Sequence, residues 1–297
     1  WGFLDGIARE AGIACTTHAR LTLEGNGVRQ DAAQARRLYE QGCERGDPTG
    51  CVALARAILE DETPDLPRVQ LLLRSACDND DFAACNDLAL LVEESDPNGA
   101  SQLYERACHN ALLVACTNLG RLTEERGNLE AARRIYADAC HRRDPEACAS
   151  LGALFELGRG GAPDVEQAAR LYERACRSRH EAGCVALATL LEDGHGIARN
   201  YERALELSSR ACDAGELLGC NNLGLLAERG HGMPRNLATA AQQYTRACEG
   251  ELQLGCVNLG VLLSEGRTAS AEDLARATSL FRTACDAGEA YGCTRLG

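Results

Sequence analysis

Apolar and polar residues follow one another along the chain with the periodicity of amphipathic helices, in pairs of segments that repeat. Residues 181–200 read EAGCVALATLLEDGHGIARN and residues 217–236 read LLGCNNLGLLAERGHGMPRN, so the two stretches align without a gap. The segments that follow them, YERALELSSRACDAG and LATAAQQYTRACEGE, align equally well. Apolar residues share one helical face in both segments of the first copy: Val185, Leu187, Leu190 and Leu191, then Ala204, Leu205, Leu207 and Ala211. The pattern predicts a unit of helix A, a turn, helix B and a shorter turn.

Short polar side chains and glycines mark the ends of these predicted helices. Residues that can cap exposed N–H groups stand just before helix B: Asn128, Asp164, Asn200 and Asn236. Glycines occupy the turn between the two helices: Gly194, Gly196, Gly230 and Gly232. Other glycines follow helix B, where we expect left-handed C′ residues: Gly215, Gly250 and Gly288. These signals predict an all-α chain in which helix pairs stack into a solenoid.

The spacing of the cysteines gives the length of the repeat. The chain has 17 Cys, of which all but one form pairs eight positions apart: Cys43 with Cys51, Cys77 with Cys85, Cys108 with Cys116, Cys140 with Cys148, Cys176 with Cys184, Cys212 with Cys220, Cys248 with Cys256 and Cys285 with Cys293. The first members of successive pairs lie 34, 31, 32, 36, 36, 36 and 37 residues apart. A motif that recurs at this interval indicates a repeat array instead of two globular domains. Cys15 remains as a free thiol, because the position of its expected partner holds Ile7.

We therefore expect one solenoid over residues 1–297. Its units lie approximately at residues 10–45, 46–79, 80–110, 111–142, 143–178, 179–214, 215–250 and 251–287, with a partial unit at 288–297. The units that begin near Cys85 and Cys116 are shorter, because the turn between helix A and helix B is compressed. The chain starts at Trp1 without a Met and stops within a predicted helix A, so we expect any targeting segment to lie outside this sequence.

Geometry favours disulfides within the cysteine pairs. One continuous helix over residues 212–220 would separate the two Cα atoms by ~12 Å, whereas a disulfide needs less than ~7 Å. The sequence Asp213-Ala214-Gly215-Glu216 supplies a turn, and two antiparallel helices would then place the cysteines side by side. Zinc sites favour ligands two to four residues apart and His is scarce here, so disulfides are the preferred interpretation over reduced thiols or a metal. Persistent disulfides imply an oxidising compartment such as the periplasm or the extracellular space.

Charge and composition exclude several function classes. The 31 basic residues are all Arg, and they face 44 Asp and Glu residues, which gives a net charge of −13. This balance disfavours nucleic acid as a partner, because phosphate contacts need a surplus of cations. The absence of Lys excludes a Walker A loop, a Schiff-base lysine and a Ser-x-x-Lys hydrolase motif. No apolar run approaches the ~18–20 residues of a membrane-spanning helix, so we expect no membrane insertion.

The repeat motifs resemble a known family. Tyr172-Glu173-Arg174-Ala175-Cys176 and Gly194-His195-Gly196-Ile197, with N-L-G or A-L-A after the second Cys, are similar to the Sel1-like repeat, which is related to the tetratricopeptide repeat. The paired cysteines make the chain resemble the cysteine-rich, disulfide-bridged Sel1-like proteins of Helicobacter and related bacteria. This resemblance implies a right-handed α/α superhelix of about eight helix pairs and a periplasmic or secreted protein. A second class, the Sel1-like respiratory-chain assembly factors of the mitochondrial intermembrane space, also carries paired cysteines.

Solenoids of this type bind an extended peptide or a protein on the concave face that their A helices form. Positions two, five and nine after the second Cys share one helical face, which we expect to line that surface. The resemblance to tetratricopeptide domains implies ligand contact for the Asn of N-L-G, and charged residues at position five complete our candidates: Asn118, Asn222, Asn258, Arg20, Arg56 and Arg121. An amide can donate to and accept from a peptide backbone at once, and Arg can bind a carboxylate.

Each of these candidates also has a purely structural interpretation. The three asparagines can join adjacent repeats by hydrogen bonds. The three arginines can be neutralised by Glu24, Glu60 and Glu125, which lie one turn further along the same helices. His195 and His231 occupy equivalent turn positions in two repeats, which is typical of turn residues and not of a metal site.

Enzymatic function is the competing class. The resemblance to cysteine-rich relatives implies weak penicillin-binding or β-lactamase activity as an alternative. The sequence contains no nucleophile elbow, no H-E-x-x-H and no repeat-breaking cluster of Ser, His and Asp. We therefore predict a non-enzymatic, monomeric interaction scaffold with no catalytic residues, no metal and no cofactor.

Overall fold

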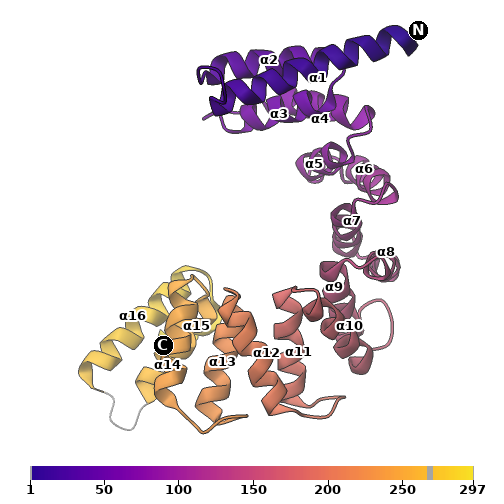
Figure 1. The fold of residues 1–297 in the computed structure, drawn as a ribbon. Helices are drawn as coiled ribbons and strands as arrows, with labels where there is room; N and C mark the ends of the chain where they lie inside the picture. The colour runs from indigo at the N-terminus through magenta and orange to yellow at the C-terminus, as the bar shows by residue number, and fades with distance from the viewer. Residues whose placement is uncertain (1, 266–269, 297) are drawn as a thin grey trace. The chain divides into compact units, whose positions relative to one another are not determined.

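The fold was established from a computed structural model, which describes residues 2–265 and 270–296, with side chains from residue 8 onward. The described residues form seventeen α-helices and no strand (Figure 1). Their bounds are α1 (Gly2–Glu24), α2 (Ala32–Glu44), α3 (Pro48–Leu59), α4 (Leu66–Asp78), α5 (Phe82–Val92), α6 (Pro97–His109), α7 (Leu113–Glu125), α8 (Leu129–His141), α9 (Pro145–Glu156), α10 (Val165–Arg177), α11 (Glu181–Asp193), α12 (Tyr201–Asp213), α13 (Leu217–Arg229), α14 (Leu237–Glu249), α15 (Gln253–Glu265), α16 (Ala271–Asp286) and α17 (Ala290–Leu296). The prediction of an all-α repeat fold is confirmed.

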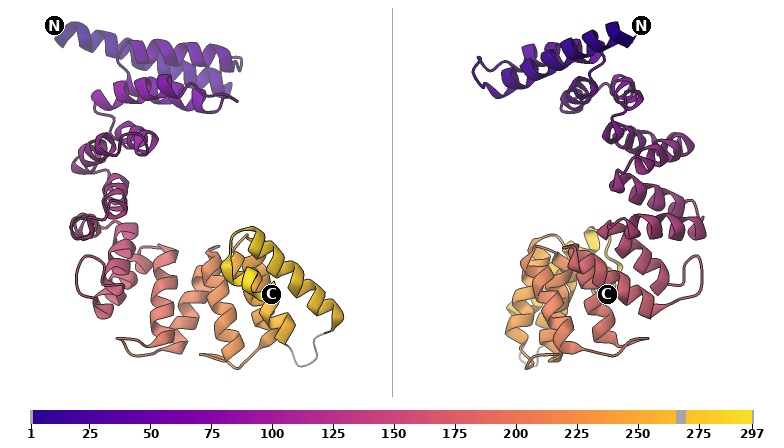
Figure 2. Two further views of the ribbon diagram at one scale, coloured as in Figure 1. Left: turned by 180° about the vertical axis from the view of Figure 1, so that it is seen from behind. Right: turned by 45° about the vertical axis from the view of Figure 1, so that its right-hand side comes forward.

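Odd-numbered helices correspond to helix A and even-numbered helices to helix B. We number the repeats 1 to 8 by these pairs, so that repeat 1 is α1 with α2 and repeat 8 is α15 with α16; α17 begins a further helix A. The helices of a pair run antiparallel, as Figure 2 shows from two sides. Within α9–α13, α11 contacts α9 and α13 as well as its sequence neighbours. Such contacts between alternate helices indicate that α9, α11 and α13 form the inner layer of this part of the second unit.

The chain divides into two compact units, residues 1–135 and residues 136–297, with the division inside α8. In the first unit the buried apolar residues form one continuous cluster that extends from Ala19 to Leu122. In the second unit they form several clusters, the largest of which extends from Ala168 to Leu226. Each helix pair thus buries its apolar face against the next pair within its unit. A single solenoid over both units stays a prediction.

Helix caps explain why the helices begin where they do. The side chains of Asp164, Asn200 and Asn236 accept hydrogen bonds from backbone N–H groups three residues on, at 2.8, 2.9 and 3.0 Å. Asn128 accepts from the N–H of Ala131 at 3.3 Å. These interactions satisfy N–H groups that have no partner within the helix. All four predicted caps are confirmed.

The prediction of a left-handed residue at Gly250 is wrong. Gly250 has φ −81°, and the left-handed residue is its neighbour Glu251, with φ 70°. The left-handed conformation always falls three residues after the first Cys of a pair, as at Gly215 and Gly288. Gly250 lies one residue too early. The register of the turn therefore follows the helix end and the cysteine pair, and non-glycine residues are forced into the left-handed region where that position holds no Gly. These residues are Asp80, Ala111, Arg143, Arg179 and Glu251.

All eight predicted disulfides are formed, and each joins the end of one repeat to the start of the next. The bridges are Cys43 with Cys51, Cys77 with Cys85, Cys108 with Cys116, Cys140 with Cys148, Cys176 with Cys184, Cys212 with Cys220, Cys248 with Cys256 and Cys285 with Cys293. Their Cα–Cα distances lie between 4.4 and 4.7 Å, as the expected turn between antiparallel helices requires. Each bridge closes a short loop and in the chain-entropy account stabilises the fold by ~2.5 kcal/mol.

The unpaired cysteine lies in the first repeat. Cys15 is a free cysteine, as the sequence predicts, and its sulfur lies 2.7 Å from Nη1 of Arg45. The side chain of Ile7, at the position of a bridging partner, lies outside the described residues. The helix A of repeat 1 therefore lacks the disulfide through Cys15 that the corresponding cysteine forms in each later repeat.

Candidate functional site

The three predicted asparagines lie on α7, α13 and α15, and each donates its side-chain amide to the preceding odd-numbered helix. The donor and acceptor pairs are Asn118 with Asn86 Oδ1 (2.9 Å), Asn222 with Thr189 Oγ1 (3.1 Å) and Asn258 with Asn221 Oδ1 (2.7 Å). All three are partly exposed. The three asparagines therefore join adjacent repeats by hydrogen bonds, as their structural interpretation expects. Their contact with a ligand stays a prediction.

The three predicted arginines differ from one another. Arg20 pairs with Glu24 at 3.6 Å, and Arg121 pairs with Glu125 at 2.8 Å, as the structural interpretation expects. Arg56 does not follow this pattern, since within the described part of the chain it forms no ion pair with Glu60 or with any other carboxylate. Arg56 is therefore the predicted arginine that remains available to a ligand.

Arg121 also takes part in a carboxylate-binding arrangement that the sequence had not indicated. Its Nη2 donates to both oxygens of Glu93 on the segment that ends α5, at 2.9 and 2.7 Å. The hydroxyl of Tyr104 on α6 donates to Oε2 of the same carboxylate at 2.8 Å. Burial alone would raise the pKa of Glu93, but the hydrogen bonds from Arg121 and Tyr104 hold that pKa below its usual value. We call the combination of Tyr104 and Arg121 the carboxylate cradle of repeat 3.

The tyrosine half of this arrangement recurs at fixed positions. The tyrosine stands four residues before the first Cys of a pair, and the glutamate stands eight residues after the second Cys of the preceding pair. In repeat 5, Tyr172 donates to Glu156 at 2.7 Å. In repeat 7, Tyr244 donates to Glu228 at 2.7 Å. Burial, followed by the neighbouring carboxylate, raises the pKa of both phenols, so they remain protonated donors.

Repeat 6 departs from the pattern. Ser208 replaces the tyrosine; it is fully buried, and its hydroxyl has no partner among the described residues. The glutamate is present as Glu192, and residues that follow α12 bind it instead. Arg229 Nη1 lies 2.9 Å from Glu192 Oε1, and His231 Nδ1 lies 3.0 Å from the same oxygen. The ring of His231 also stacks on Tyr201 at a centroid distance of 4.1 Å. His231 is thus a contact between repeats as well as a turn residue.

Repeat 1 departs from the pattern in the opposite way. Tyr39 on α2 occupies the tyrosine position and Arg56 on α3 occupies the position of Arg121, but Leu23 on α1 replaces the glutamate. A groove of about 340 Å³ is lined by these three residues together with Arg36, Glu60 and alanines that include Ala53. Ala53, Arg56 and Glu60 are the residues predicted for the inner stripe at positions two, five and nine. Sequence reasoning missed Tyr39 and Leu23, because the recurring tyrosine and glutamate positions indicate a site only once the contact of Arg121 with Glu93 is known.

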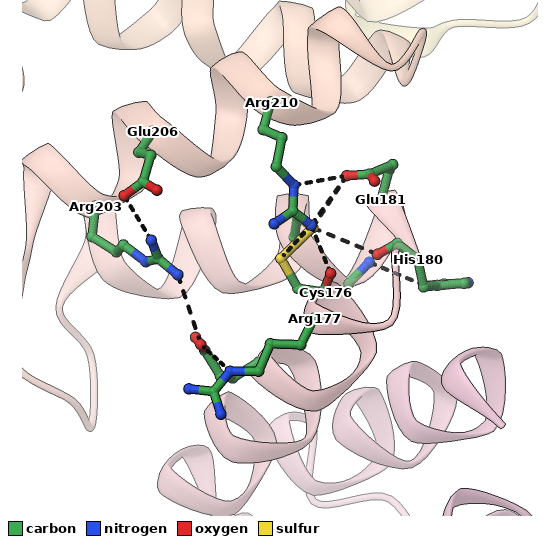
Figure 3. The surroundings of a disulfide bond; sticks show 10 residues. Cys176, Arg177, His180, Glu181, Arg203, Glu206 and Arg210 are labelled. Atoms are coloured by element: carbon green, nitrogen blue, oxygen red, sulfur yellow. Dashed lines mark hydrogen bonds and ion pairs between the residues drawn. A yellow bond between two sulfur atoms is a disulfide. The ribbon is translucent and has the colours of Figure 1, made fainter. Parts of the chain in front are cut away.

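A second set of polar contacts joins consecutive repeats next to the disulfides. Arg210 on α12 donates to the backbone oxygen of Cys176 at 2.6 Å, and its guanidinium also lies against the Cys176–Cys184 bridge and Glu181 (Figure 3). Arg246 makes the equivalent approach to the sulfur of Cys212 at 3.3 Å. The arginine two residues before the first Cys of a pair therefore binds the end of the preceding helix B, and its role is structural.

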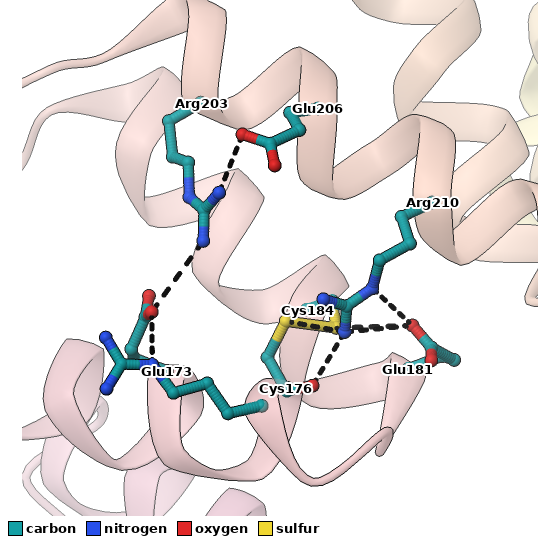
Figure 4. A network of polar contacts seen from close by, with 8 residues as sticks. Glu173, Cys176, Glu181, Cys184, Arg203, Glu206 and Arg210 are labelled. Carbon is teal, nitrogen blue, oxygen red and sulfur yellow. Dashed lines mark hydrogen bonds and ion pairs between the residues drawn. A yellow bond between two sulfur atoms is a disulfide. The ribbon is translucent and has the colours of Figure 1, made fainter.

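Nearby charges are paired among themselves. Arg203 Nη1 lies 2.6 Å from Glu206, and Arg203 Nη2 lies 3.7 Å from Glu173 (Figure 4). Glu173 in turn pairs with Arg177 at 2.9 Å. Such exposed pairs contribute little to stability and leave no free carboxylate here for a ligand. Among the described residues, no group of three or more His, Cys, Asp and Glu side chains is placed to hold a metal ion.

Two further findings concern the cellular environment. Eight disulfides indicate an oxidising compartment, because reducing compartments keep such thiols reduced. None of the helices in residues 2–265 and 270–296 combines the length and apolar character that a membrane crossing requires.

Known structures share this fold. A Sel1 repeat protein from Oxalobacter formigenes aligns over 100% of this chain and 90% of its own length, with 19% identity and a TM-score of 0.76. The protective antigen c5321 of uropathogenic Escherichia coli, which displays an SLR fold, aligns over 96% of this chain with 23% identity and a TM-score of 0.71. This chain spans 63% of that antigen. Helicobacter pylori cysteine rich protein B aligns over 41% of this chain and 87% of its own, with 24% identity and a TM-score of 0.34.

Family comparison agrees with the structure. No curated protein matches the chain. The Sel1 repeat model matches residues 14–47, 145–180, 182–216, 217–251 and 253–289. The matched segments cover repeat 1 and repeats 5 to 8, whereas residues 48–144, which include the shorter repeats, are not matched. Because these segments make up more than half of the sequence, and because the cysteine pairs are bridged, the chain belongs to the Sel1 repeat family as a cysteine-rich member.

Proposed function

We propose that this chain is a non-enzymatic scaffold that binds an extended segment of a protein partner on the face formed by its odd-numbered helices. Proteins built from Sel1 and tetratricopeptide-like repeats typically bind protein partners. The observation that carries the proposal is the exposure of large apolar side chains at predicted inner positions. Leu90, at position five after Cys85, is 47% exposed, and Leu157, at position nine after Cys148, is 67% exposed. Each leucine by itself would be ordinary on a protein surface, and it is their location at predicted inner positions that supports a surface covered by a partner.

The compartment is part of the same proposal. The disulfides support a periplasmic or secreted protein, with the mitochondrial intermembrane space as the alternative. A monomer is proposed because each repeat is already covered by its neighbours within a unit. Light scattering on the oxidised protein tests the monomer, and a mass near twice 31.7 kDa would contradict it.

Peptide display with matched variants tests the binding face. Random twelve-residue peptides are selected on the oxidised full chain, and the affinity of a selected peptide is measured by calorimetry. Leu157→Arg places a charge on the proposed face and is expected to weaken binding about tenfold or more. Leu71→Arg is the control, because Leu71 is 69% exposed on the even-numbered helix α4. Equal affinities for the two variants would remove the proposed face.

A hydrolysis assay tests the absence of catalysis. Nitrocefin is incubated with the oxidised chain and with the same chain after reduction and denaturation. We expect equal background rates from the two samples. Turnover that requires the folded chain would contradict the non-enzymatic proposal and would support the β-lactamase alternative.

A further inference from the structure

Repeat 1 has a tyrosine and an arginine at the sequence positions of the carboxylate cradle of repeat 3, but it lacks the glutamate that supplies the carboxylate. Along the chain, a tyrosine on helix B is combined with an arginine at position five of the next helix A in these two repeats alone. In repeat 3 the tyrosine is Tyr104, the arginine is Arg121, and both bind Glu93. In repeat 1 the tyrosine is Tyr39 and the position of the glutamate holds Leu23, while the arginine, Arg56, comes from the first helix of repeat 2.

The groups of this second cradle have no partner within the described part of the chain. The hydroxyl of Tyr39 donates no hydrogen bond there, and Arg56 forms no ion pair. Burial, followed by the charge of Glu24, raises the pKa of Tyr39, so its phenol remains a donor at neutral pH. The two side chains line one groove of about 340 Å³. Leu23, which lines the same groove, occupies the sequence position that Glu93 has in repeat 3.

Neighbouring charges leave the arginine available. Glu24 is held by Arg20 at 3.6 Å, and Asp61 is held by Arg36 at 3.0 and 2.9 Å. Glu60 lines the groove, but it is not paired with Arg56 although the two lie one helical turn apart. A carboxylate that enters the groove would therefore meet an unpaired guanidinium and a phenol donor, which is the donor set that binds Glu93.

We propose that this groove binds the carboxylate of an acidic side chain, a glutamate in an extended segment of the partner protein. The partner's carboxylate takes the place that Glu93 has in repeat 3, between the hydroxyl of Tyr39 and the guanidinium of Arg56. Charge-assisted hydrogen bonds of this kind are directional and strong for their size. The inference rests on the proposed function in one respect, namely that the carboxylate belongs to a protein.

A blocked tripeptide tests the chemistry without a known partner. The full oxidised chain is labelled with ¹³C in its 7 tyrosines and titrated with acetyl-Ala-Glu-Ala-amide or with acetyl-Ala-Gln-Ala-amide. Tyr39→Phe assigns the ring signal of Tyr39. We expect that signal to shift with the Glu peptide, and to require about tenfold more of it in Arg56→Gln. An equal response to the Gln peptide, or an unchanged titration in Arg56→Gln, would overturn the proposal.

A gain of the missing carboxylate provides the second test. Leu23 is 42% exposed, so Leu23→Glu removes little buried surface and supplies a carboxylate to the cradle from within the chain. We expect this variant to block the Glu peptide and to unfold at a higher urea concentration than the parent. Leu59→Glu is the matched control, because Leu59 is 45% exposed at the same position of repeat 2, where Leu73 and Leu90 replace the tyrosine and the arginine. Equal effects of the two substitutions would contradict the cradle.

The outcomes separate this inference from the proposed function. If displayed peptides bind and respond to Leu157→Arg, but the Glu tripeptide does not shift Tyr39, the carboxylate site fails and the scaffold stands. If the Glu tripeptide binds through Arg56 but no displayed peptide is enriched, the protein-binding function fails and the carboxylate site stands.

Discussion

Repeats 6 and 7, which are neighbours in the second unit, solve the same packing problem with different residues. In repeat 7 the ring of Tyr244 lies against Gly224, where an added Cβ would come within 2.6 Å of the ring, and its hydroxyl binds Glu228. In repeat 6 the corresponding positions hold Ser208 and Ala188. In repeat 7 a large ring packs over a glycine and fills the space between helix A and helix B. In repeat 6 a serine and an alanine occupy the same two positions.

The difference changes which repeat binds the glutamate. Glu228 is bound from within its own repeat, whereas Glu192 is bound by Arg229 and His231, at the end of α13 and in the loop after it. Glu192 is only 9% exposed, so its charge needs those partners. Where the tyrosine is present, as in repeat 7, it binds the glutamate within one helix pair. Where serine replaces it, as in repeat 6, the equivalent glutamate is bound by residues of the next repeat.

Removal of the ring gives the largest expected effect. Tyr244→Ala deletes a fully buried aromatic side chain and is expected to lower the free energy of unfolding by about 3–5 kcal/mol. Ser208→Ala removes a buried hydroxyl that has no partner among the described residues, so we expect a change within about 1 kcal/mol or a gain in stability. Urea unfolding of the oxidised chains, followed by circular dichroism, measures both. Similar losses for the two variants would break the comparison.

Exchange of the small residue gives the next effect. Gly224→Ala places a methyl group against the ring of Tyr244 and is expected to cost about 1–3 kcal/mol. Ala188→Gly in repeat 6 is expected to cost only the helix propensity of glycine, about 0.5–1 kcal/mol. The double variant Gly224→Ala with Tyr244→Ser reproduces the residues of repeat 6. The single variant Tyr244→Ser completes the cycle, and if the double variant loses as much unfolding free energy as the two single variants together, the ring and the glycine are not coupled.

The contact between repeats gives a smaller effect. Arg229→Gln removes an ion pair from Glu192, whose side chain is 10% exposed, and is expected to lower the free energy of unfolding by about 1–2 kcal/mol. Arg170→Gln is the control, because Arg170 pairs with Glu166 at 3.6 Å on an exposed surface and is expected to contribute less than about 0.5 kcal/mol. Equal losses in urea unfolding would show that Glu192 does not depend on repeat 7.

Much of the fold could be predicted because the signals are local. Apolar spacing, polar caps such as Asn200, and the cysteine interval depend on residues within one or two turns, and all three were confirmed. The preference of glycine for the left-handed conformation predicts Gly250 wrongly, because the register of the turn decides which residue adopts it. The cysteine pair fixes that register, and Glu251 takes the left-handed conformation in spite of its side chain.

The candidate site was less predictable because it depends on contacts between helices. Arg121 and Arg56 occupy equivalent positions, and each has a glutamate four residues later. Only the structure shows that Arg121 reaches back to Glu93 at the end of the preceding odd-numbered helix. The absence of the corresponding glutamate at Leu23 has meaning only once that contact is known, since a single exposed leucine is otherwise ordinary.

Titration of Glu93 in repeat 3 with acid gives the smallest expected effect. It tests the repeat in which both a tyrosine and an arginine bind the glutamate. The folded-state pKa of Glu93 lies below its usual value, near 4.3 in an unfolded chain. Its contribution to stability is therefore present above that pH and is lost as pH falls through the folded pKa. Glu93→Gln is expected to reduce the difference in unfolding free energy between pH 7 and pH 3 by less than about 1 kcal/mol, because Arg121 is partly solvent-exposed.

Glu94→Gln, at the exposed neighbouring residue, is the control, and the measurement is urea unfolding at both pH values. An identical acid dependence in the two variants would mean that the tyrosine and arginine donors do not stabilise the ionised carboxylate, and the argument from repeat 3 to the groove of repeat 1 would lose its basis.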